Sequence, residues 1–358
     1  MKTSTLREKF PVLRAIAYLN AGTDGPLPTA AIQAAAAELE REAEQGRAQR
    51  HFERRGELSS DLRSAYASIL GCPAEDTALT SCTSEGIGQV IGGLELHAGD
   101  EIVTSDEEHP GLLGALAAAH ELREVSIRMV SLGEVAEAVG PRTKLVACSH
   151  VGWMSGSLAP AELADVDVPV LLDGAQGIGA VPVDVGVLGC DAYAGAGQKW
   201  LCGPDGIGML HTTPQLRERL MVSRRGYSNL GQPNAGLQAG LHEDARRLDS
   251  MSLSAESVAC ALAATQVLGG PGWLAVHECS CSLAALLAER LAESGREVAP
   301  RDATTLVSFQ SPDPPAERAR LAEQGVILRD IPGRPWLRAS VGAWNDESDI
   351  ERLLSGLA

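Results

Sequence analysis

The sequence predicts an α/β fold with a mostly parallel sheet, followed by a smaller α+β unit. Between about residues 29 and 210, short apolar segments alternate with segments of helical composition, which is typical of parallel sheets covered by helices. After about residue 250, two long helical segments come first, and short apolar and helical segments then alternate. Of the 358 residues, 44% are hydrophobic and 22% are charged, so the chain has enough apolar side chains for one or two cores.

The elements of the first part follow from composition and turn residues. Residues 29–50 are rich in Ala and Glu and predict a helix, and residues 58–70 predict a second helix that ends at Gly71. Further helices are expected at 85–96 and 111–122. Short apolar segments bounded by turn residues predict strands at 77–81, 101–105, 125–130, 144–151, 168–173, 191–194 and 206–210.

The second part predicts a different order of elements. The expected elements are helices at 254–268, 272–293, 315–323 and 346–356, with strands at 305–310, 326–329 and 336–341. We therefore predict two domains. Residues 1–250 hold the N-terminal segment and the large α/β domain, and residues 251–358 form a small α+β C-terminal domain.

Charge and cysteine content limit the partners that can be expected. The formal net charge is −17, and an acidic surface repels nucleic acid and anionic membranes, so neither is expected as a partner. Neither a membrane-spanning segment nor a signal peptide is expected. Eight dispersed cysteines are too few for a disulfide scaffold and suit reduced thiols, so we expect a cytoplasmic protein.

Two polar residues stand at the ends of apolar segments. Asp173 ends the segment 168–173, and Lys199 follows the next short apolar segment in a Gly-rich turn. Parallel sheets bind ligands at the carboxyl ends of their strands, and a desolvated lysine is a usable nucleophile. Taken alone, each residue is better explained as an ordinary turn residue. The pair favours pyridoxal phosphate (PLP), because a lysine binds its aldehyde and a carboxylate keeps its pyridine nitrogen protonated.

The start of the helix near residue 83 predicts a phosphate site. Cys82, Thr83 and Ser84 follow a strand-like segment and open a helix, where backbone N–H groups bind anions. The alternative is a plain helix cap, although the Glu that a capping box needs at its third position is missing. Nucleotide-binding loops do not fit, because GAGQKW lacks the Gly-Lys-Ser/Thr order and GIGQVIGG misspaces the glycines.

Five segments together resemble the class V aminotransferases of PLP fold type I. They are EEHPG (107–111), SHVGWMSG (149–156), DGAQ (173–176), GQKWLCGPDG (197–206) and RASVGAWNDESDIERL (338–353). That group includes cysteine desulfurases, selenocysteine lyases, isopenicillin N epimerase-like proteins and cystine C–S lyases. The resemblance covers nearly the whole chain and implies the PLP-dependent transferase fold type I. This fold has a large domain with a mostly parallel, seven-stranded-type sheet between helices and a small α+β C-terminal domain.

The resemblance implies catalytic roles for Lys199, Asp173 and His109 and a cofactor-binding role for Gln176. Lys199 holds PLP as a Schiff base and removes the α-proton of the substrate. Asp173 pairs with the pyridine nitrogen, Gln176 hydrogen-bonds the ring oxygen O3′, and His109 stacks on the ring face.

The resemblance also implies binding roles. Thr83 or Ser84 binds the phosphate, and Arg338 binds the substrate α-carboxylate, for which its planar fork is suited. Ser252 stands where relatives place a threonine that reaches the phosphate of the neighbouring subunit, which implies a homodimer.

The chain departs from the desulfurase pattern at three places. Gln198, a further cofactor-binding candidate, stands where desulfurases usually carry His, and Ala196 stands where Ser or Thr is frequent. The segment before Arg338 has no cysteine, whereas desulfurases use one there to accept sulfur as a persulfide. Cys202 lies near Lys199 in sequence but is better explained as a small apolar core residue.

We therefore expect a PLP-dependent lyase that abstracts the α-proton of an amino acid and carries out β-elimination on cystine or a cysteine S-conjugate. The alternatives are an isopenicillin N epimerase-like or aminotransferase activity in small-molecule biosynthesis, and, less favoured, a cysteine desulfurase. A non-catalytic protein of this fold would be expected to have lost Lys199 or Asp173.

The remaining candidates have two interpretations each. Trp153 and Tyr227 line the substrate pocket or fill the core, and Arg54 and Arg55 lie at a dimer edge of the active site or on a solvated face. The segment 277–281 (HECSC) has metal-ligand residue types, but it lies in a helical run in which i and i+2 face different sides. No metal site is therefore expected.

Overall fold

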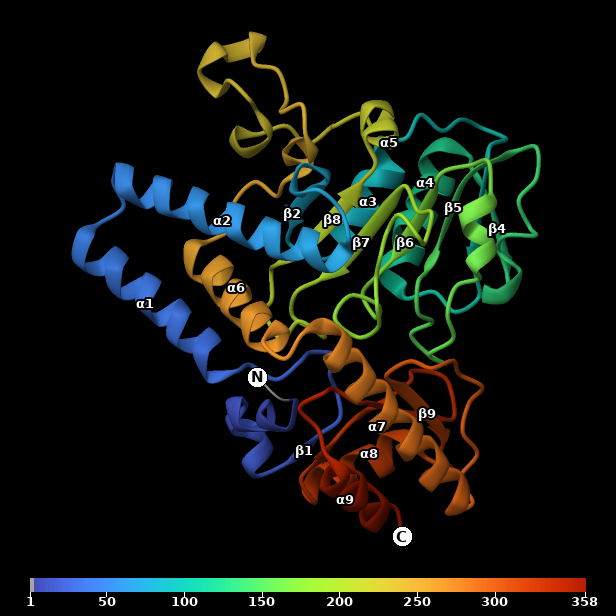
Figure 1. The fold of residues 1–358 in the computed structure, drawn as a ribbon. Coiled ribbons are helices and arrows are strands. Elements are labelled where there is room, and N and C mark those ends of the chain that lie inside the picture. Colours follow the sequence, from blue (N-terminus) through green and yellow to red (C-terminus); the bar gives the residue numbers. More distant parts are fainter. Residues whose placement is uncertain (1–2) are drawn as a thin grey trace.

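The computed structural model describes residues 3–358, and a seven-stranded sheet forms its centre (Figure 1). In spatial order the strands are β2 (Thr77–Thr80), β8 (Gly208–Thr212), β7 (Ala192–Ala196), β6 (Val170–Asp173), β5 (Thr143–Ser149), β3 (Glu101–Ser105) and β4 (Ser126–Val130). Strand β8 runs antiparallel to both of its neighbours, and the other neighbouring pairs are parallel. The predicted α/β fold with a mostly parallel sheet is confirmed.

Both faces of the sheet are covered by helices. Successive side chains of a strand point to opposite faces, so each strand contributes to both cores. Leu79, Val103, Val146 and Leu172 pack on one face with helices α2 (Gln49–Leu70) and α6 (Ala255–Gly269). Their neighbours Ala78, Ile102, Leu145 and Leu171 pack on the other face with α3 (Thr83–Gly93), α4 (Pro110–Arg123) and α5 (Pro214–Arg219). Helix α1 (Thr29–Gln45) packs against α6 (Figure 1).

The predicted helix 29–50 is wrong at its end. Helix α1 stops at Gln45, because Gly46 takes a φ of +71°, a left-handed conformation that glycine adopts readily and that ends helices. Helix α2 then begins at Gln49, well before the predicted start at residue 58.

The C-terminal part packs around a second, smaller sheet. Its strands are β11 (Arg329–Asp330), β12 (Trp336–Ser340) and β9 (Leu306–Gln310), all antiparallel, and its helices are α7 (Trp273–Glu293), α8 (Pro314–Glu323) and α9 (Glu347–Leu357). The predicted strand 326–329 is two strands, because β10 (Val326–Ile327) pairs with the N-terminal strand β1 (Ala17–Tyr18) while β11 pairs with β12.

Two packing relations bear on the predicted domains. Strand β1 contributes Ala17 to the C-terminal core, whereas α6 contributes Val258 to the core under the large sheet. The N-terminal strand therefore packs with the C-terminal unit, and α6 packs with the large sheet. The boundary between residues 250 and 251 stays a prediction.

The middle of the segment 221–250 projects from the end of the large sheet, at the top of Figure 1, whereas Val222, Ala245 and Leu248 near its ends pack in the core. The segment holds three short 3-10 helices, Tyr227–Asn229, Pro233–Gln238 and Ala245–Leu248. Among residues 3–358, no single helix is long and apolar enough to cross a membrane, although α6 and α7 meet the length and composition requirements as a pair bent by 76°.

Candidate active site

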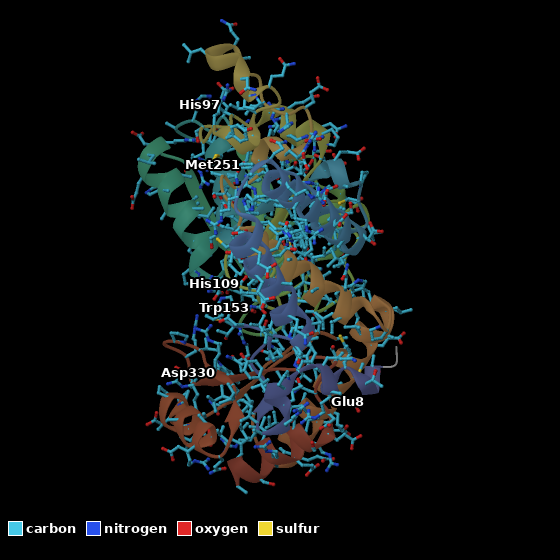
Figure 2. The ribbon with its side chains drawn as sticks, turned by 90° about the vertical axis from the view of Figure 1, so that its left-hand side faces the viewer. Glu8, His97, His109, Trp153, Met251 and Asp330 are labelled. Atoms are coloured by element: carbon cyan, nitrogen blue, oxygen red, sulfur yellow. The ribbon has the colours of Figure 1, made fainter. Side chains whose placement is uncertain are left out.

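A cavity of about 220 Å³ lies where the carboxyl ends of β6 and β7 meet α3, the loop before α4 and the C-terminal sheet. Figure 2 shows two of its residues, His109 and Trp153, between the large sheet and the C-terminal unit. The structure brings together nine of the residues predicted from sequence: Thr83, Ser84, His109, Trp153, Asp173, Gln176, Gln198, Lys199 and Arg338. They come from segments far apart in the chain, so the fold assembles this site.

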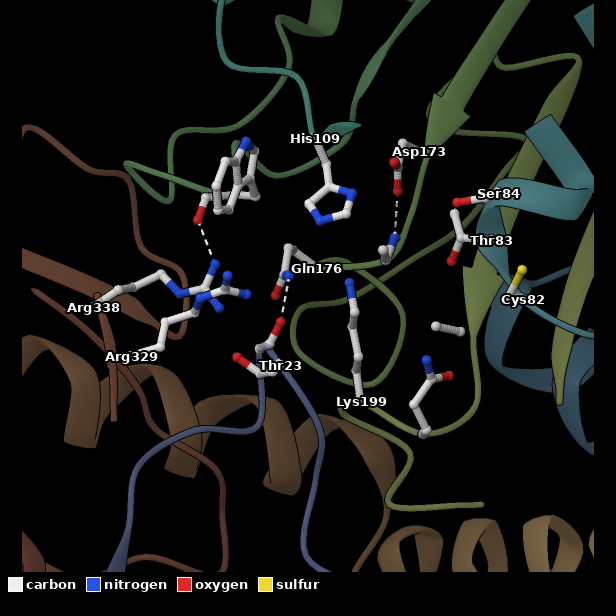
Figure 3. A pocket seen from close by; sticks show the side chains of 15 residues that line it. Thr23, Cys82, Thr83, Ser84, His109, Asp173, Gln176, Lys199, Arg329 and Arg338 are labelled. Carbon is white, nitrogen blue, oxygen red and sulfur yellow. Dashed lines mark hydrogen bonds between the residues drawn. The ribbon is translucent and has the colours of Figure 1, made fainter. Parts of the chain in front are cut away.

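Asp173 and Lys199 lie on neighbouring walls of the cavity (Figure 3). Asp173 is buried at the end of β6, and one carboxylate oxygen accepts the Ala175 N–H at 2.9 Å. Burial raises the pKa of Asp173, and the positive charge of Lys199 opposes that increase. Burial lowers the pKa of Lys199 to about 8, against the opposing effect of Asp173. A neutral amine is therefore available to Lys199 near neutral pH, as a nucleophile or base requires.

His109 faces Lys199 across the cavity in Figure 3. It is the N-cap of α4, and its Nδ1 accepts the Gly111 N–H at 3.1 Å, which fixes the ring. The ring also packs edge-on against Trp153, with 5.3 Å between centroids. Burial and the nearby charge of Lys199 lower the pKa of His109 to about 4. The imidazole is therefore neutral at physiological pH and presents an uncharged ring to the cavity.

The start of α3 supplies anion-binding groups at one end of the cavity. Cys82 is the N-cap, and no side-chain hydrogen bond caps the helix, so the plain-cap interpretation is not supported. The Thr83 hydroxyl is buried and has no hydrogen-bond partner, and the Gln198 amide oxygen also has none. A buried polar group without a partner is costly, so these groups are suited to a polar ligand at the helix N-terminus.

Two arginines occupy the opposite end (Figure 3). Arg338 on β12 is fully buried, and its Nη1 donates to the Trp153 carbonyl at 2.6 Å. Its Nε and Nη2 have no partner. Burial and the charge of Arg329 lower the pKa of Arg338 to about 9, so it keeps its charge at neutral pH.

Arg329 was missed by the sequence analysis. It is on β11, directly opposite Arg338 in the antiparallel register, and it also lines the cavity. Its guanidinium carbon lies 5.7 Å from the Trp153 ring centroid. The signal that could have predicted it is a hairpin turn at 331–335, which pairs the two arginines across β11 and β12.

Gln176 connects the site to the N-terminal loop, a link that the sequence did not predict. Its Nε2 donates to the Gly22 carbonyl at 2.8 Å, and its Oε1 accepts from the Trp200 indole at 3.0 Å. Gly22 has no room for a side chain, because a Cβ there would lie 2.8 Å from Arg338 Nη2. The loop therefore closes tightly over the cavity.

Several predicted residues lie outside the cavity of their own chain. Tyr227 is 72% exposed on the projecting segment, and Ser252 is exposed next to that segment. The interpretation of Tyr227 as a core residue is therefore wrong, and the substrate-pocket role of Tyr227 and the phosphate role of Ser252 stay predictions. Arg54 pairs with Glu38 on α1 at 3.0 Å, and Arg55 lies over Phe52.

Cys202 and His277, two candidates from the sequence, contribute to packing in the structure. Cys202 is fully buried in an apolar cluster, and His277 stacks on Trp273 in α7. Within residues 3–358, no group of three or more His, Cys, Asp or Glu residues could hold a metal ion. A thiol that was not predicted as a site residue, that of Cys82, lines the cavity.

Comparisons with known proteins agree on the architecture. The aminotransferase class-V family model matches residues 17–353. The isopenicillin N epimerase of Amycolatopsis lactamdurans is 29% identical over 388 residues, covering 98% of this chain and 96% of that protein. A probable cysteine desulfurase of Pseudomonas aeruginosa is 33% identical over 350 residues, covering 87% of this chain and 83% of that protein.

A solved cystine C–S lyase is also similar over its whole length. C-DES in complex with its reaction product, cysteine persulfide, has a TM-score of 0.91 at 30% identity, over 97% of this chain and 98% of that one. A C-DES variant with glycine covalently linked to its PLP cofactor has a TM-score of 0.93 at 29% identity, over 98% of both chains.

Proposed function

Because the chain belongs to the aminotransferase class-V family, whose cofactor is PLP, we propose that it is a lyase that cleaves a C–S bond of cystine or a cysteine S-conjugate by β-elimination. The observation that carries the proposal is the pair of cavity arginines, Arg338 and Arg329. One guanidinium suffices for an α-carboxylate. A second one beside it suits a substrate with another carboxylate, and cystine has two.

The residues present fit PLP. The unpartnered Thr83 hydroxyl and the N-terminus of α3 would hold its phosphate, and the buried Asp173 carboxylate would hold the proton on its pyridine nitrogen. The neutral imidazole of His109 would cover the ring. The Lys199 amine would bind the aldehyde carbon. Bound PLP supplies an electron sink for the bonds to the substrate α-carbon.

The protein groups then direct the reaction. Arg338 binds the α-carboxylate through its free Nε and Nη2, which fixes the direction of the Cα–H bond. Lys199 takes that proton, because burial keeps its pKa near 8. Loss of the β-sulfur as a leaving group completes the elimination. For cystine the balance is cystine plus water to cysteine persulfide, pyruvate and ammonia, with no oxidant or reductant required.

The placement of thiols supports elimination over desulfuration. Desulfuration would need a cysteine near the substrate sulfur to accept it. Among the described residues, Cys82 is the thiol that lines the cavity, and it lies at the phosphate end beside Thr83. The arginines that would bind the substrate lie at the other end (Figure 3).

Epimerisation is the second candidate function. It is favoured by the similarity to an isopenicillin N epimerase over 98% of this chain. Both reactions begin when Lys199 removes the α-proton, and they differ in whether a β-substituent leaves or a proton returns to the other face.

Product analysis by mass spectrometry separates the candidates. The purified enzyme is incubated with cystine, cysteine S-conjugates and amino acids that have no β-leaving group. We expect pyruvate and a persulfide or thiol in equal amounts from the sulfur substrates. Formation of alanine from cysteine would indicate a desulfurase. A keto acid formed without β-cleavage would indicate an aminotransferase. Inversion at Cα, followed in deuterated water, would indicate an epimerase. Any of these without pyruvate would overturn the proposal.

We also propose a cytoplasmic homodimer. Three large apolar side chains are exposed on the projecting segment, Met221, Tyr227 and Leu237, and they would be covered if this segment packed on a second subunit next to the predicted phosphate contact of Ser252. Mixing Lys199→Ala and Ser252→Ala proteins tests the shared site. We expect partial recovery of activity in the heterodimer, and a fully active monomer in sedimentation would contradict it.

A further inference from the structure

Glu108 is a buried carboxyl group next to His109 that is not itself a cavity-lining residue. It joins the ends of two neighbouring strands of the sheet. Its Oε1 accepts from the Ser105 hydroxyl at the end of β3 at 2.5 Å and from the Ser149 N–H at the end of β5 at 2.9 Å. Its Oε2 accepts from the Ser149 hydroxyl at 2.7 Å. All its partners are neutral.

The surroundings of Glu108 are short of positive charge. Apart from the Ser105 and Ser149 hydrogen bonds, the titratable groups that act on or face Glu108 are the Asp173 carboxyl on β6 and the Cys148 thiol on β5. Ser149 and Asp173 are paired in the register of β5 and β6. Glu108 and Asp173 are thus two buried carboxyl groups on one side of the site, and two such groups ionise together only at a cost.

The serines allow Glu108 to be charged or neutral without losing hydrogen bonds. When the carboxyl is ionised, it accepts from both hydroxyls and from the Ser149 N–H. When it is protonated, its own O–H can donate to a serine hydroxyl, because a hydroxyl can rotate to accept. Burial raises the pKa of Glu108 to about 7, against the effect of the Ser105 and Ser149 hydrogen bonds, and the charge of Asp173 adds to the increase.

We propose that Glu108 is a positioning residue of the PLP site that takes up or releases one proton and so adjusts the negative charge behind Asp173. With Glu108 neutral, Asp173 alone balances the protonated pyridine nitrogen. With Glu108 ionised, a second negative charge favours the protonated forms of the bound cofactor. The same carboxyl fixes the backbone just before His109. Ionisation of Glu108 near neutral pH therefore changes how readily the bound cofactor is protonated. This effect does not depend on which substrate the enzyme uses.

The test is the pH dependence of the visible absorbance of bound PLP in the holoenzyme without substrate. Glu108→Gln is the main variant, because the amide keeps the shape and stays neutral. Its oxygen can accept from the Ser105 hydroxyl and the Ser149 N–H, and its NH₂ group can donate to the Ser149 hydroxyl, which then turns to accept. We expect its absorbance transition to shift to lower pH by about one unit, an ordinary size for the loss of one neighbouring charge. Glu107→Gln is the matched control, since Glu107 is half-buried, binds Ser155, and has no link to Asp173. Its transition should stay at the wild-type pH.

A second variant tests the proposal if the Glu108→Gln protein does not bind PLP. Ser105→Ala removes one hydroxyl that stabilises the ionised carboxylate, so Glu108 keeps its proton to higher pH and the absorbance transition shifts in the same direction by less. Carbon-13 NMR of labelled glutamate carboxyls should also show one group with a midpoint near neutral pH, absent from Glu108→Gln. Wild-type transitions in the PLP-loaded variants, or no glutamate titrating near neutral pH in the wild type, would overturn the proposal.

Discussion

Arg338→Ala is the perturbation whose effect follows most directly from the geometry. The guanidinium is fully buried, its Nη1 donates to the Trp153 carbonyl, and its Nε and Nη2 have no partner. Arg338 lines the cavity. Under the proposed function, its removal deletes a two-point, charge-assisted contact to the substrate carboxylate. Such a contact contributes about 2–4 kcal/mol to transition-state stabilisation, or roughly 30- to 1000-fold in kcat/KM.

The assay is steady-state pyruvate formation from cystine, with PLP content measured in each preparation. Arg338→Lys separates charge from shape, because it keeps a cation but not the planar fork, and we expect it to recover only part of the loss. Arg334→Ala, an exposed arginine in the same hairpin, should retain wild-type kinetics. A PLP-loaded Arg338→Ala enzyme with near-wild-type kcat/KM would refute the assignment of Arg338 to the carboxylate.

Three further outcomes are expected. Asp173→Asn should keep PLP but lose most of its turnover, because an amide cannot hold the pyridinium charge; normal turnover at full PLP occupancy would mean that Asp173 is only structural. Cys202→Ser should remain nearly fully active in the pyruvate assay, since the thiol packs in an apolar cluster, and a persulfide on Cys202 in the wild type would instead indicate desulfuration. Because burial lowers the pKa of Lys199 to about 8, attachment of PLP to the apoprotein should accelerate as pH rises through about 8 and then level off; an increase that continues to the ordinary lysine value of 10.5 would contradict the burial effect.

Local patterns were enough to predict the large sheet. Each strand is a short apolar segment between turn residues, and the alternation with helices predicts parallel strands whose carboxyl ends meet. Helix ends were harder, because Gly46 interrupts a segment whose composition stays helical on both sides. The pairing of β1 with β10 was not predictable from either segment alone, since the two strands are distant in sequence.

Site residues that belong to sequence motifs were predicted, whereas those that strand pairing or backbone contacts bring to the site were not. Asp173 and Lys199 follow strands and could be placed by inspection. Arg329 reaches the cavity only because β11 and β12 form a hairpin in one register. Gly22 belongs to the site because its backbone carbonyl accepts a hydrogen bond from Gln176. Sequence motifs do not predict such a backbone contact.

The position of Lys199 at the centre of a PLP site is tested most directly by borohydride reduction. The purified yellow holoenzyme is reduced, digested and mapped by mass spectrometry. The account predicts a pyridoxyl group on the peptide containing Lys199 and loss of both label and visible absorbance in Lys199→Ala. A label on a different lysine, or a protein that binds no PLP after reconstitution, would contradict it.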